Sequence, residues 1–278
     1  MSNPKQLLDK YDIQPKKSLG QNFLNDPNAL DKIISVSDLS PNDTVLEIGA
    51  GTGALTEKLA QTVKRVVAIE LDDRLFTVLG AQLNPYPNVE LHHADILQVN
   101  LPEVMGDEPY VVVANVPYYI TSAILRHLLE TAYRPTKIII TIQTEVAERI
   151  IAKPPDMSVL AVSVQFYGTP DIVTRFNPAV FYPRPEVGSA VLRVITHDAP
   201  VIDVPSEALF FRVVRAGFGQ KRKQLKNALA HNLAMKSEDV VALCATAGID
   251  PVRRAETLTL PEWATLTEAF RQWRADGG

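Results

Sequence analysis

The stretch VLEIGAGTG at residues 45–53 decides the fold, because it reads as a buried strand that runs straight into a glycine-rich turn. Gly49, Gly51 and Gly53 alternate with other residues, and a helical pattern starts at Ala54. Glycine adopts backbone angles that are closed to other residues and lets a ligand approach the main chain. The pattern predicts a strand, a ligand-contacting turn and a helix in succession, which is the first half of a βαβ unit.

The same alternation continues outward from this turn. Apolar runs occupy residues 44–48, 65–69, 89–92, 110–114 and 137–142, and most of them are nearly continuous. Such runs are typical of parallel strands that are covered on both faces by helices. Leu55, Leu59 and Val63 recur every four residues between the first two runs, as expected for a helix. We therefore predict a doubly wound α/β domain whose ligand crevice lies beyond the carboxyl ends of its strands.

The pattern changes after a proline-rich segment that ends at residue 205. Helical segments are expected at about residues 206–215, 221–232, 237–247 and 261–274, with no strand between them. The domain boundary is placed near residue 203. Residues 1–203 then form the α/β domain, which includes an N-terminal segment of residues 1–43, and residues 204–278 form a small helical domain.

Composition narrows the class of protein. The 278 residues are 46% apolar and 22% charged, which is typical of a folded, soluble chain. One cysteine, Cys244, forms no internal disulfide, and it is expected to be buried. The amino terminus lacks the apolar core of a signal peptide, and the apolar stretch 111–125 is too short and polar to span a bilayer. These features predict a cytoplasmic protein with no membrane partner, and we expect a monomer.

Acidic residues stand where a nucleotide would need them. Glu70 closes the second strand about twenty residues after the glycine turn, where a carboxylate can accept both ribose hydroxyls of an adenosine. Asp95 follows the third strand and can accept from an adenine amino group, while Ile96 can pack on the ring. The glycines and Glu70 alone fit a nicotinamide cofactor equally well, since Gly49-x-Gly51-x-x-Ala54 satisfies its relaxed fingerprint.

The motif after the fourth strand distinguishes a nicotinamide cofactor from other adenosine-containing ligands. Asn115-Val116-Pro117-Tyr118 has no use in hydride transfer, but it suits a methyltransferase that acts on an exocyclic amine. The adenine N6 lone pair is delocalised, so two acceptors must hold its hydrogens. The Asn115 oxygen and a main-chain carbonyl near Val116 can do so, proline stiffens the turn, and Tyr118 can stack on the base. We expect S-adenosylmethionine as methyl donor and no metal, because the histidines and the cysteine show no ligand spacing.

At this point the chain resembles the ribosomal RNA adenine N6,N6-dimethyltransferases, most closely those of the small subunit. The resemblance rests on residues 17–24 (KSLGQNFL), 47–53, Glu70, Asp95-Ile96, 115–118, 181–185 (FYPRP) and 219–223 (GQKRK), which cover nearly the whole chain. Where relatives carry Pro-Lys-Val-Asp-Ser, this chain has Pro185-Glu186-Val187-Gly188-Ser189. The resemblance implies a class I methyltransferase fold, a mostly parallel seven-stranded sheet with a helical C-terminal domain.

The resemblance also implies site residues and a substrate. The implied cofactor-binding residues are Gln21, Asn22, Leu24, Glu47, Gly49, Gly51, Gly53, Glu70, Leu71, Asp95, Ile96 and Asn115. The implied catalytic residues are Asn115, Pro117, Tyr118 and Phe181, with Phe181 as a second aromatic that sandwiches a flipped adenine against Tyr118. The implied reaction dimethylates two adjacent adenosines of 16S ribosomal RNA in a pre-30S particle, during ribosome biogenesis.

One stretch is strongly basic although the chain carries 28 basic and 32 acidic residues, a net charge of −4. Residues 210–228 contain no acid and six basic residues: Arg212, Arg215, Lys221, Arg222, Lys223 and Lys226. Such a run can be merely a solvated helix face, but within an acidic protein it favours contact with the RNA backbone.

Three other functions fit parts of the sequence. One is a large-subunit ribosomal RNA adenine methyltransferase of the macrolide-resistance type. A second is a nicotinamide-dependent oxidoreductase, suggested by Gly49, Gly51 and Ala54. A third is a non-catalytic RNA-binding protein that keeps the methyltransferase fold.

Overall fold

The chain divides into two compact units, described by a computed structural model over residues 4–220 and 222–276. The first unit comprises Met1–Ala147 and Thr169–Thr196, and the second comprises Glu148–Gly168 and His197–Gly278. The second unit therefore takes in residues 148–168, which precede the boundary that we expected near residue 203. The separation into functional domains at residue 203 stays a prediction.

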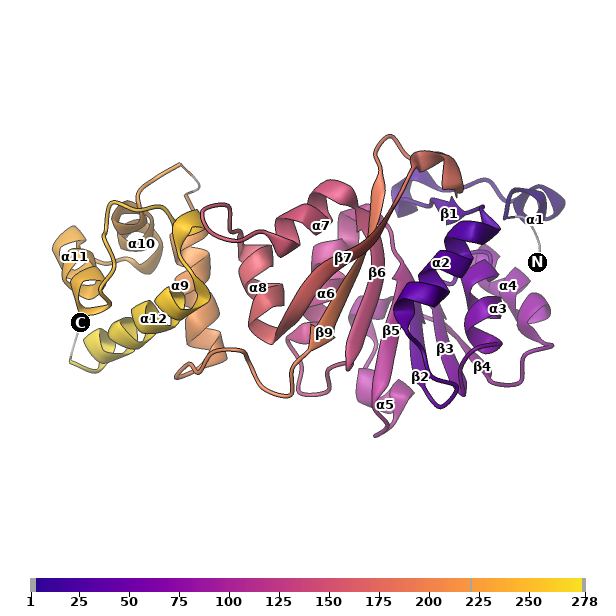
Figure 1. Cartoon of the computed structure of the whole chain (residues 1–278), viewed down its shortest axis with the longest axis horizontal. Coiled ribbons are helices and arrows are strands. Elements are labelled where there is room, and N and C mark those ends of the chain that lie inside the picture. Colours follow the sequence, from indigo (N-terminus) through magenta and orange to yellow (C-terminus); the bar gives the residue numbers. More distant parts are fainter. Residues whose placement is uncertain (1–3, 221, 277–278) are drawn as a thin grey trace. The chain divides into compact units, whose positions relative to one another are not determined.

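A seven-stranded sheet forms the centre of the first unit, within the described residues (Figure 1). Its order is β4-β3-β2-β5-β6-β9-β7. The strands β2 to β6 are mutually parallel, and β9 runs antiparallel to β6. The bounds are β2 (Thr44–Ile48), β3 (Arg65–Glu70), β4 (Val89–His93), β5 (Tyr110–Asn115), β6 (Lys137–Gln143), β7 (Gly168–Phe176) and β9 (Ser189–Thr196). The predicted Rossmann-like, mostly parallel sheet is confirmed.

The strand order places the site. From β2 the chain proceeds outward to β3 and β4, and it then returns to β5 on the other side of β2. The order thus reverses between β2 and β5, where Ile48 lies beside Ala114. The connections after β2 and β5 leave the sheet in opposite directions at this point. They therefore leave a crevice between them, at the carboxyl ends of the two strands. Both the glycine turn after β2 and the Asn115 motif after β5 open into that crevice.

Helices cover both faces of this sheet, which explains why its strands are apolar on both sides. All five residues of β2 are buried. In Figure 1, α2 lies over one face and α6 lies behind the other. The helices of this unit are α1 (Pro4–Lys10), α2 (Pro27–Ser37), α3 (Ala54–Ala60), α4 (Asp73–Leu83), α5 (Leu101–Met105) and α6 (Thr121–Leu129), and α7 (Thr144–Ile151) begins in it.

A small second sheet ties the N-terminal segment to the site. Strand β1 (Phe23–Leu24) pairs antiparallel with β8 (Phe181–Tyr182). Phe23 is the partner of Tyr182 in this pair, and Leu24 is the partner of Phe181. The Asn25 amide donates to the Val180 carbonyl at 2.8 Å just beyond the strand. Neither short strand was predicted, since two-residue strands leave no periodic signal in a sequence.

The second unit is built from helices around buried aromatic side chains. Its helices are α8 (Val159–Tyr167), α9 (Glu207–Phe218), α10 (Leu225–Leu233), α11 (Ser237–Thr246) and α12 (Leu260–Ala275). The ring of Phe166 on α8 stacks on that of Phe210 on α9, with their centroids 4.7 Å apart. This contact explains why α8 belongs to the helical unit. The four helices predicted after residue 205 are confirmed, and within the described residues no helix has the length and apolar character needed to cross a membrane.

Candidate active site

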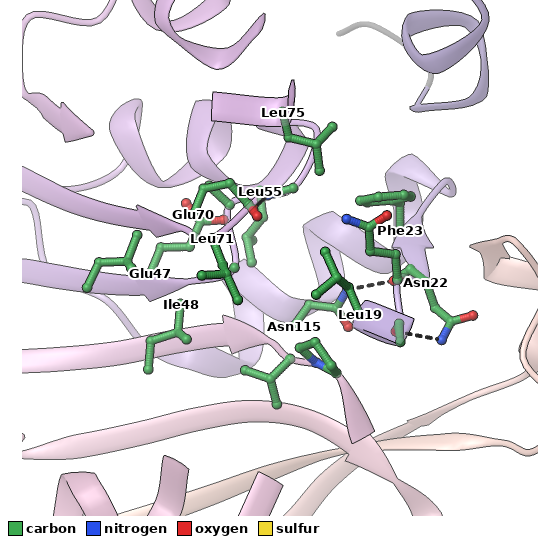
Figure 2. A pocket seen from close by; sticks show the side chains of 18 of the residues that line it. Leu19, Asn22, Phe23, Glu47, Ile48, Leu55, Glu70, Leu71, Leu75 and Asn115 are labelled. Atoms are coloured by element: carbon green, nitrogen blue, oxygen red, sulfur yellow. Dashed lines mark hydrogen bonds between the residues drawn. The ribbon is translucent and has the colours of Figure 1, made fainter. Parts of the chain in front are cut away.

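A cavity of about 950 Å³, open to solvent at its mouth, lies at the carboxyl ends of β2, β3 and β5. Every predicted cofactor-binding residue except Gly53 lines it, from Gln21 on the N-terminal segment to Asn115 at the end of β5. Figure 2 shows Asn22, Glu70 and Asn115 among them. The tertiary structure thus brings together residues that are as many as 94 positions apart in the chain.

The glycines of the turn have different tasks. Gly49, Gly51 and Gly53 have φ values of +76°, +62° and +75°, a region that other residues rarely adopt. A Cβ on Gly51 would lie 3.1 Å from the Phe23 ring, so glycine keeps this wall of the cavity open. Gly53 does not line the cavity. It caps helix α3, and a Cβ there would lie 2.9 Å from Leu79.

Glu70 connects the glycine turn to the end of β3. Its Oε2 accepts the Gly51 N–H at 2.7 Å, and its Oε1 accepts the Asp72 N–H at 2.8 Å. Burial raises the pKa of Glu70, while these two hydrogen bonds oppose the rise. Each carboxylate oxygen has a further lone pair, so Glu70 can also accept the hydroxyl groups of a ribose.

Glu47 is the most deeply buried carboxyl group of the site. Its residue is 1% exposed, and no hydrogen-bond partner is found for its Oε2 among the described residues. Burial raises the pKa of Glu47 to about 8, and the negative charge of Glu70 adds to the rise. A buried polar oxygen without a partner is costly. The group also lines the cavity, and the neighbouring Thr56 hydroxyl opposes the rise in its pKa.

Asp95 caps a short turn and also lines the cavity. Its side chain caps the short 3-10 turn η2 (Ile96–Gln98), with Oδ1 accepting the Leu97 N–H at 3.0 Å. The residue also lines the cavity, together with Ile96, which is buried. One carboxylate can serve both purposes, because a cap uses only one of its lone pairs.

Asn115 ends β5 with its amide group held in one orientation. Its Nδ2 donates to the main-chain carbonyl of Asn22 at 3.0 Å (Figure 2). A carbonyl can only accept, so the nitrogen of the amide must face Asn22 and the oxygen must face away from it. The geometry leaves the Asn115 Oδ1 available as an acceptor in the cavity wall.

The other predicted catalytic residues are placed differently. Pro117 lines the cavity, but neither Tyr118 nor Phe181 does. The Tyr118 hydroxyl lies 2.7 Å from the Ser189 Oγ, and burial raises the pKa of this phenol. Phe181 is only 4% exposed and packs in the hydrophobic core with Leu24 and Val180. The stacking role assigned to these two rings stays a prediction.

Two features in or beside the cavity were not foreseen. Tyr119 lines its mouth with 61% of its surface exposed, although only Tyr118 was singled out. Asp72 is buried, and Gln21 and Arg74 both donate to its carboxylate. These hydrogen bonds lower the pKa of Asp72, although burial acts in the opposite direction. The spacing of Asp72 two residues after Glu70 could have marked it as part of the same strand end.

The predicted RNA-binding residues lie in the helical unit, apart from Lys221, which is outside the described residues. Arg212 and Arg215 are exposed on α9, Arg222 and Lys223 are exposed before α10, and Lys226 is half-buried on α10. The Arg212 guanidinium lies over the Phe270 ring, 5.6 Å from its centroid. In the described part of the chain, no ion pair is formed by any of these five residues.

Neither a metal centre nor a reactive thiol is formed by the residues that the structure describes. No group of three or more His, Cys, Asp or Glu side chains could hold a metal ion in residues 4–220 and 222–276. Cys244 is fully buried as predicted, and burial raises the pKa of its thiol to about 11.

Nearly the full length of the chain is similar in sequence to known proteins. A family model described as Ribosomal RNA adenine dimethylase matches residues 13–272. A protein of Dehalococcoides mccartyi named Ribosomal RNA small subunit methyltransferase A is 45% identical over 267 residues, which is 96% of this chain and 92% of that protein. A protein of the same name from Anoxybacillus flavithermus is 43% identical, covering 95% of this chain and 93% of its own length.

Solved structures show the same fold. A dimethyladenosine transferase from Plasmodium falciparum superposes with a TM-score of 0.74 at 25% identity, covering 90% of this chain and 98% of its own. The 23S rRNA methyltransferase ErmE superposes with a TM-score of 0.69 at 27% identity, covering 90% of this chain and all of its own. Both similarities extend through most of the chain.

Proposed function

The chain belongs to the ribosomal RNA adenine dimethylase family, and we propose that it transfers methyl groups from S-adenosylmethionine to N6 of two adjacent adenosines in small-subunit ribosomal RNA. The observation that carries this proposal is the Asn115 amide, which the Asn22 carbonyl holds with its oxygen free beside the cavity. The substrate follows the small-subunit relatives, which are more similar in sequence than the 23S methyltransferase ErmE.

The residues of the cavity fit the donor. Glu70 would hold the ribose hydroxyls, Asp95 and Ile96 would hold the adenine, and the open wall at Gly51 would let the donor approach the main chain. The unpartnered Oε2 of Glu47 would receive a hydrogen-bond donor from the bound molecule. When bound, S-adenosylmethionine supplies an electrophilic methyl group on a sulfonium.

Asn115 would prepare the nucleophile. The N6 nitrogen is a poor nucleophile while its lone pair is conjugated with the ring. A hydrogen bond from the amine to the Asn115 Oδ1 holds one N–H and favours a geometry in which the lone pair points out of the ring plane. The same oxygen stabilises the positive charge that grows on nitrogen as the methyl arrives. Because the amide orientation is fixed beforehand by Asn22, little reorganisation is needed in the transition state.

Aromatic side chains would hold the base after it leaves its stack. Tyr118 is fixed by its hydroxyl contact with Ser189, and Phe181 lies on β8 beside Leu24. In the proposal these two rings bracket the adenine, as base-flipping enzymes commonly do. The buried position of Phe181 means that its ring must become accessible when RNA binds.

The helical unit would bind the RNA backbone. Its unpaired side chains Arg215, Arg222, Lys223 and Lys226 supply positive charge without reading sequence. Together with Lys221 and Arg212 they would position the RNA, while Tyr118 and Phe181 would hold the extruded base. We further propose that a pre-30S particle in the cytoplasm is the substrate and that the protein acts as a monomer.

A methyl-transfer assay with two substrates tests the proposal. Undermethylated 30S particles and protein-free 23S ribosomal RNA are incubated with tritiated donor, and the nucleosides are then identified by mass spectrometry. We expect N6,N6-dimethyladenosine from the 30S particles. Label found only in the 23S RNA would instead assign the protein to the macrolide-resistance type. Binding of NAD without binding of S-adenosylmethionine, measured by calorimetry, would favour the oxidoreductase.

A further inference from the structure

A buried carboxylate outside the predicted site anchors the N-terminal segment over the cavity. Asp72 is 2% exposed, and its Oδ2 accepts the Gln21 Nε2–H at 2.8 Å. The Arg74 guanidinium donates to both oxygens of the same carboxylate, at 2.9 Å from Nε and 2.6 Å from Nη2. Lys16 lies 3.7 Å away as a second cation. Asp72 is therefore held ionised in the fold, and Gln21 is bound to a fixed acceptor.

Gln21, which is bound to Asp72, also forms a hydrogen bond within its own segment. The Gln21 Oε1 accepts the Lys16 N–H at 2.8 Å, which closes the loop of residues 16–21 on itself. Arg74 also donates to the Gln14 carbonyl at 3.1 Å, so a second point of the segment is tied to the same carboxylate. The Asn22 side chain donates to the Gly20 carbonyl at 3.1 Å. Gln14, Lys16 and Gln21 are thus connected to Asp72 by polar contacts, and the Asn22 side chain adds a contact within the segment.

The segment ends next to Asn115, the residue proposed to bind the target amine. Asn22 follows Gln21 directly, and its carbonyl is the acceptor that orients the Asn115 amide at 3.0 Å. A displacement of this carbonyl by about 1 Å would lengthen the hydrogen bond beyond its useful range. The amide of Asn115 could then rotate and present its nitrogen to the target amine, and two donors facing each other form no hydrogen bond.

We propose that Asp72 and Gln21 are positioning residues for methyl transfer: Asp72 holds Gln21, and through the adjacent Asn22 carbonyl this pair keeps the Asn115 oxygen turned toward the target amine. This inference rests on the proposed function, because it assumes that Asn115 accepts a hydrogen bond from the amine. The anchor itself is independent of that assumption. The two parts are therefore tested by separate measurements.

The change Gln21→Glu gives the sharpest test, because it makes the anchor depend on pH. At pH 8 the introduced carboxylate lies next to the carboxylate of Asp72, and Glu70 is a second negative charge nearby. Their repulsion opposes the attraction that Lys16 and Arg74 exert on the introduced group. The neighbouring negative charge raises the pKa of the introduced group, so it binds a proton as the pH falls. Its O–H then donates to Asp72 as the amide did. Gln21→Leu has no donor at either pH, and Gln61→Glu on the exposed end of α3 is the matched control.

Two readouts that need no RNA test the anchor. Hydrogen exchange of the peptide 16–24 and the side-chain amide resonance of Asn115 are compared with the parent at pH 5.5 and pH 8. For Gln21→Glu we expect faster exchange and a shifted resonance at pH 8, and parent-like behaviour at pH 5.5. Gln21→Leu should differ from the parent at both values, and Gln61→Glu at neither. If the exchange of Gln21→Glu matches the parent at pH 8, Asp72 does not anchor the segment and the inference is wrong.

Kinetics test the link to catalysis. At saturating donor and RNA, kcat of Gln21→Glu should fall about tenfold at pH 8 and return to within about twofold of the parent at pH 5.5. Faster exchange with unchanged kcat would overturn the positioning role, since the segment would then move without affecting the reaction. If the parent itself transfers no methyl group, the proposed function fails, while the exchange and resonance data still decide whether Asp72 and Gln21 orient Asn115.

Discussion

Glu47 is a buried acid on β2, the strand that precedes the glycine turn. The change Glu47→Gln should make the free energy of unfolding less dependent on pH. The carboxyl group is enclosed at 1% exposure with its Oε2 unpartnered among the described residues. Burial raises its pKa from 4.5 to about 8, so the folded chain keeps a proton that the unfolded chain loses near pH 4.5. Glutamine has almost the same shape and cannot ionise, so it isolates this titration.

The sign and the magnitude follow from proton linkage. Below pH 4.5 both states hold the proton, and the group has no effect on the pH dependence. Between pH 4.5 and about 8 only the folded state holds it, so the free energy of unfolding falls by about 1.4 kcal/mol per pH unit. The total loss is about 5 kcal/mol for this fully buried group. Relative to the parent, the glutamine variant should therefore gain about 4 kcal/mol between pH 5 and pH 8.

Urea unfolding at pH 5, 6, 7 and 8 measures this difference. Both tryptophans, Trp263 and Trp273, lie in the helical unit, so the sheet is followed by far-UV circular dichroism rather than by fluorescence. Glu103→Gln, at an exposed carboxylate on α5, controls for the loss of one negative charge. A constant packing cost of the amide cancels, because it is the same at every pH. A difference between Glu47→Gln and the parent that stays flat from pH 5 to pH 8 would refute the reasoning, since Glu47 would then be ionised in the fold.

Three further changes test the site and the RNA-binding surface. Asn115→Ala should lower kcat about 10²- to 10³-fold in a single-turnover assay, because one preorganised acceptor is lost, while gel-shift affinity for RNA is kept. Arg222→Ala combined with Lys223→Ala should reduce the slope of log binding constant against log salt by about 0.7 to 0.9 per lost phosphate contact, and an unchanged slope would remove them from the interface. Gly51→Ala should raise the calorimetric Kd for the donor at least tenfold, because its φ of +62° is strained for alanine and Phe23 is only 3.1 Å from the new Cβ. Gly80→Ala, which has open space around its Cβ, is the control, and equal effects of the two changes would contradict the argument.

The sequence predicted the sheet, the glycine turn and most of the cavity. These features depend on local signals: continuous apolar runs mark strands buried on both faces, and glycines mark turns that need positive φ. Glu70, Asp95 and Asn115 were predicted because each lies at or just beyond the carboxyl end of a strand. In a parallel sheet the carboxyl ends of neighbouring strands lie at one edge, so residues at these ends must lie near each other. The chain order alone therefore predicted a common site for them.

Other features required the tertiary structure, because they depend on partners that are distant in sequence. The orientation of the Asn115 amide is set by the Asn22 carbonyl, 93 residues earlier, and no local pattern encodes that contact. The burial of Phe181 follows from the pairing of β8 with β1, and the membership of α8 in the helical unit follows from the packing of Phe166 on Phe210. Periodicity shows which faces of an element are apolar, but only the folded chain decides which surface each face meets. The folded chain also decides the direction of a hydrogen bond, because donor and acceptor must both be in place before either is oriented.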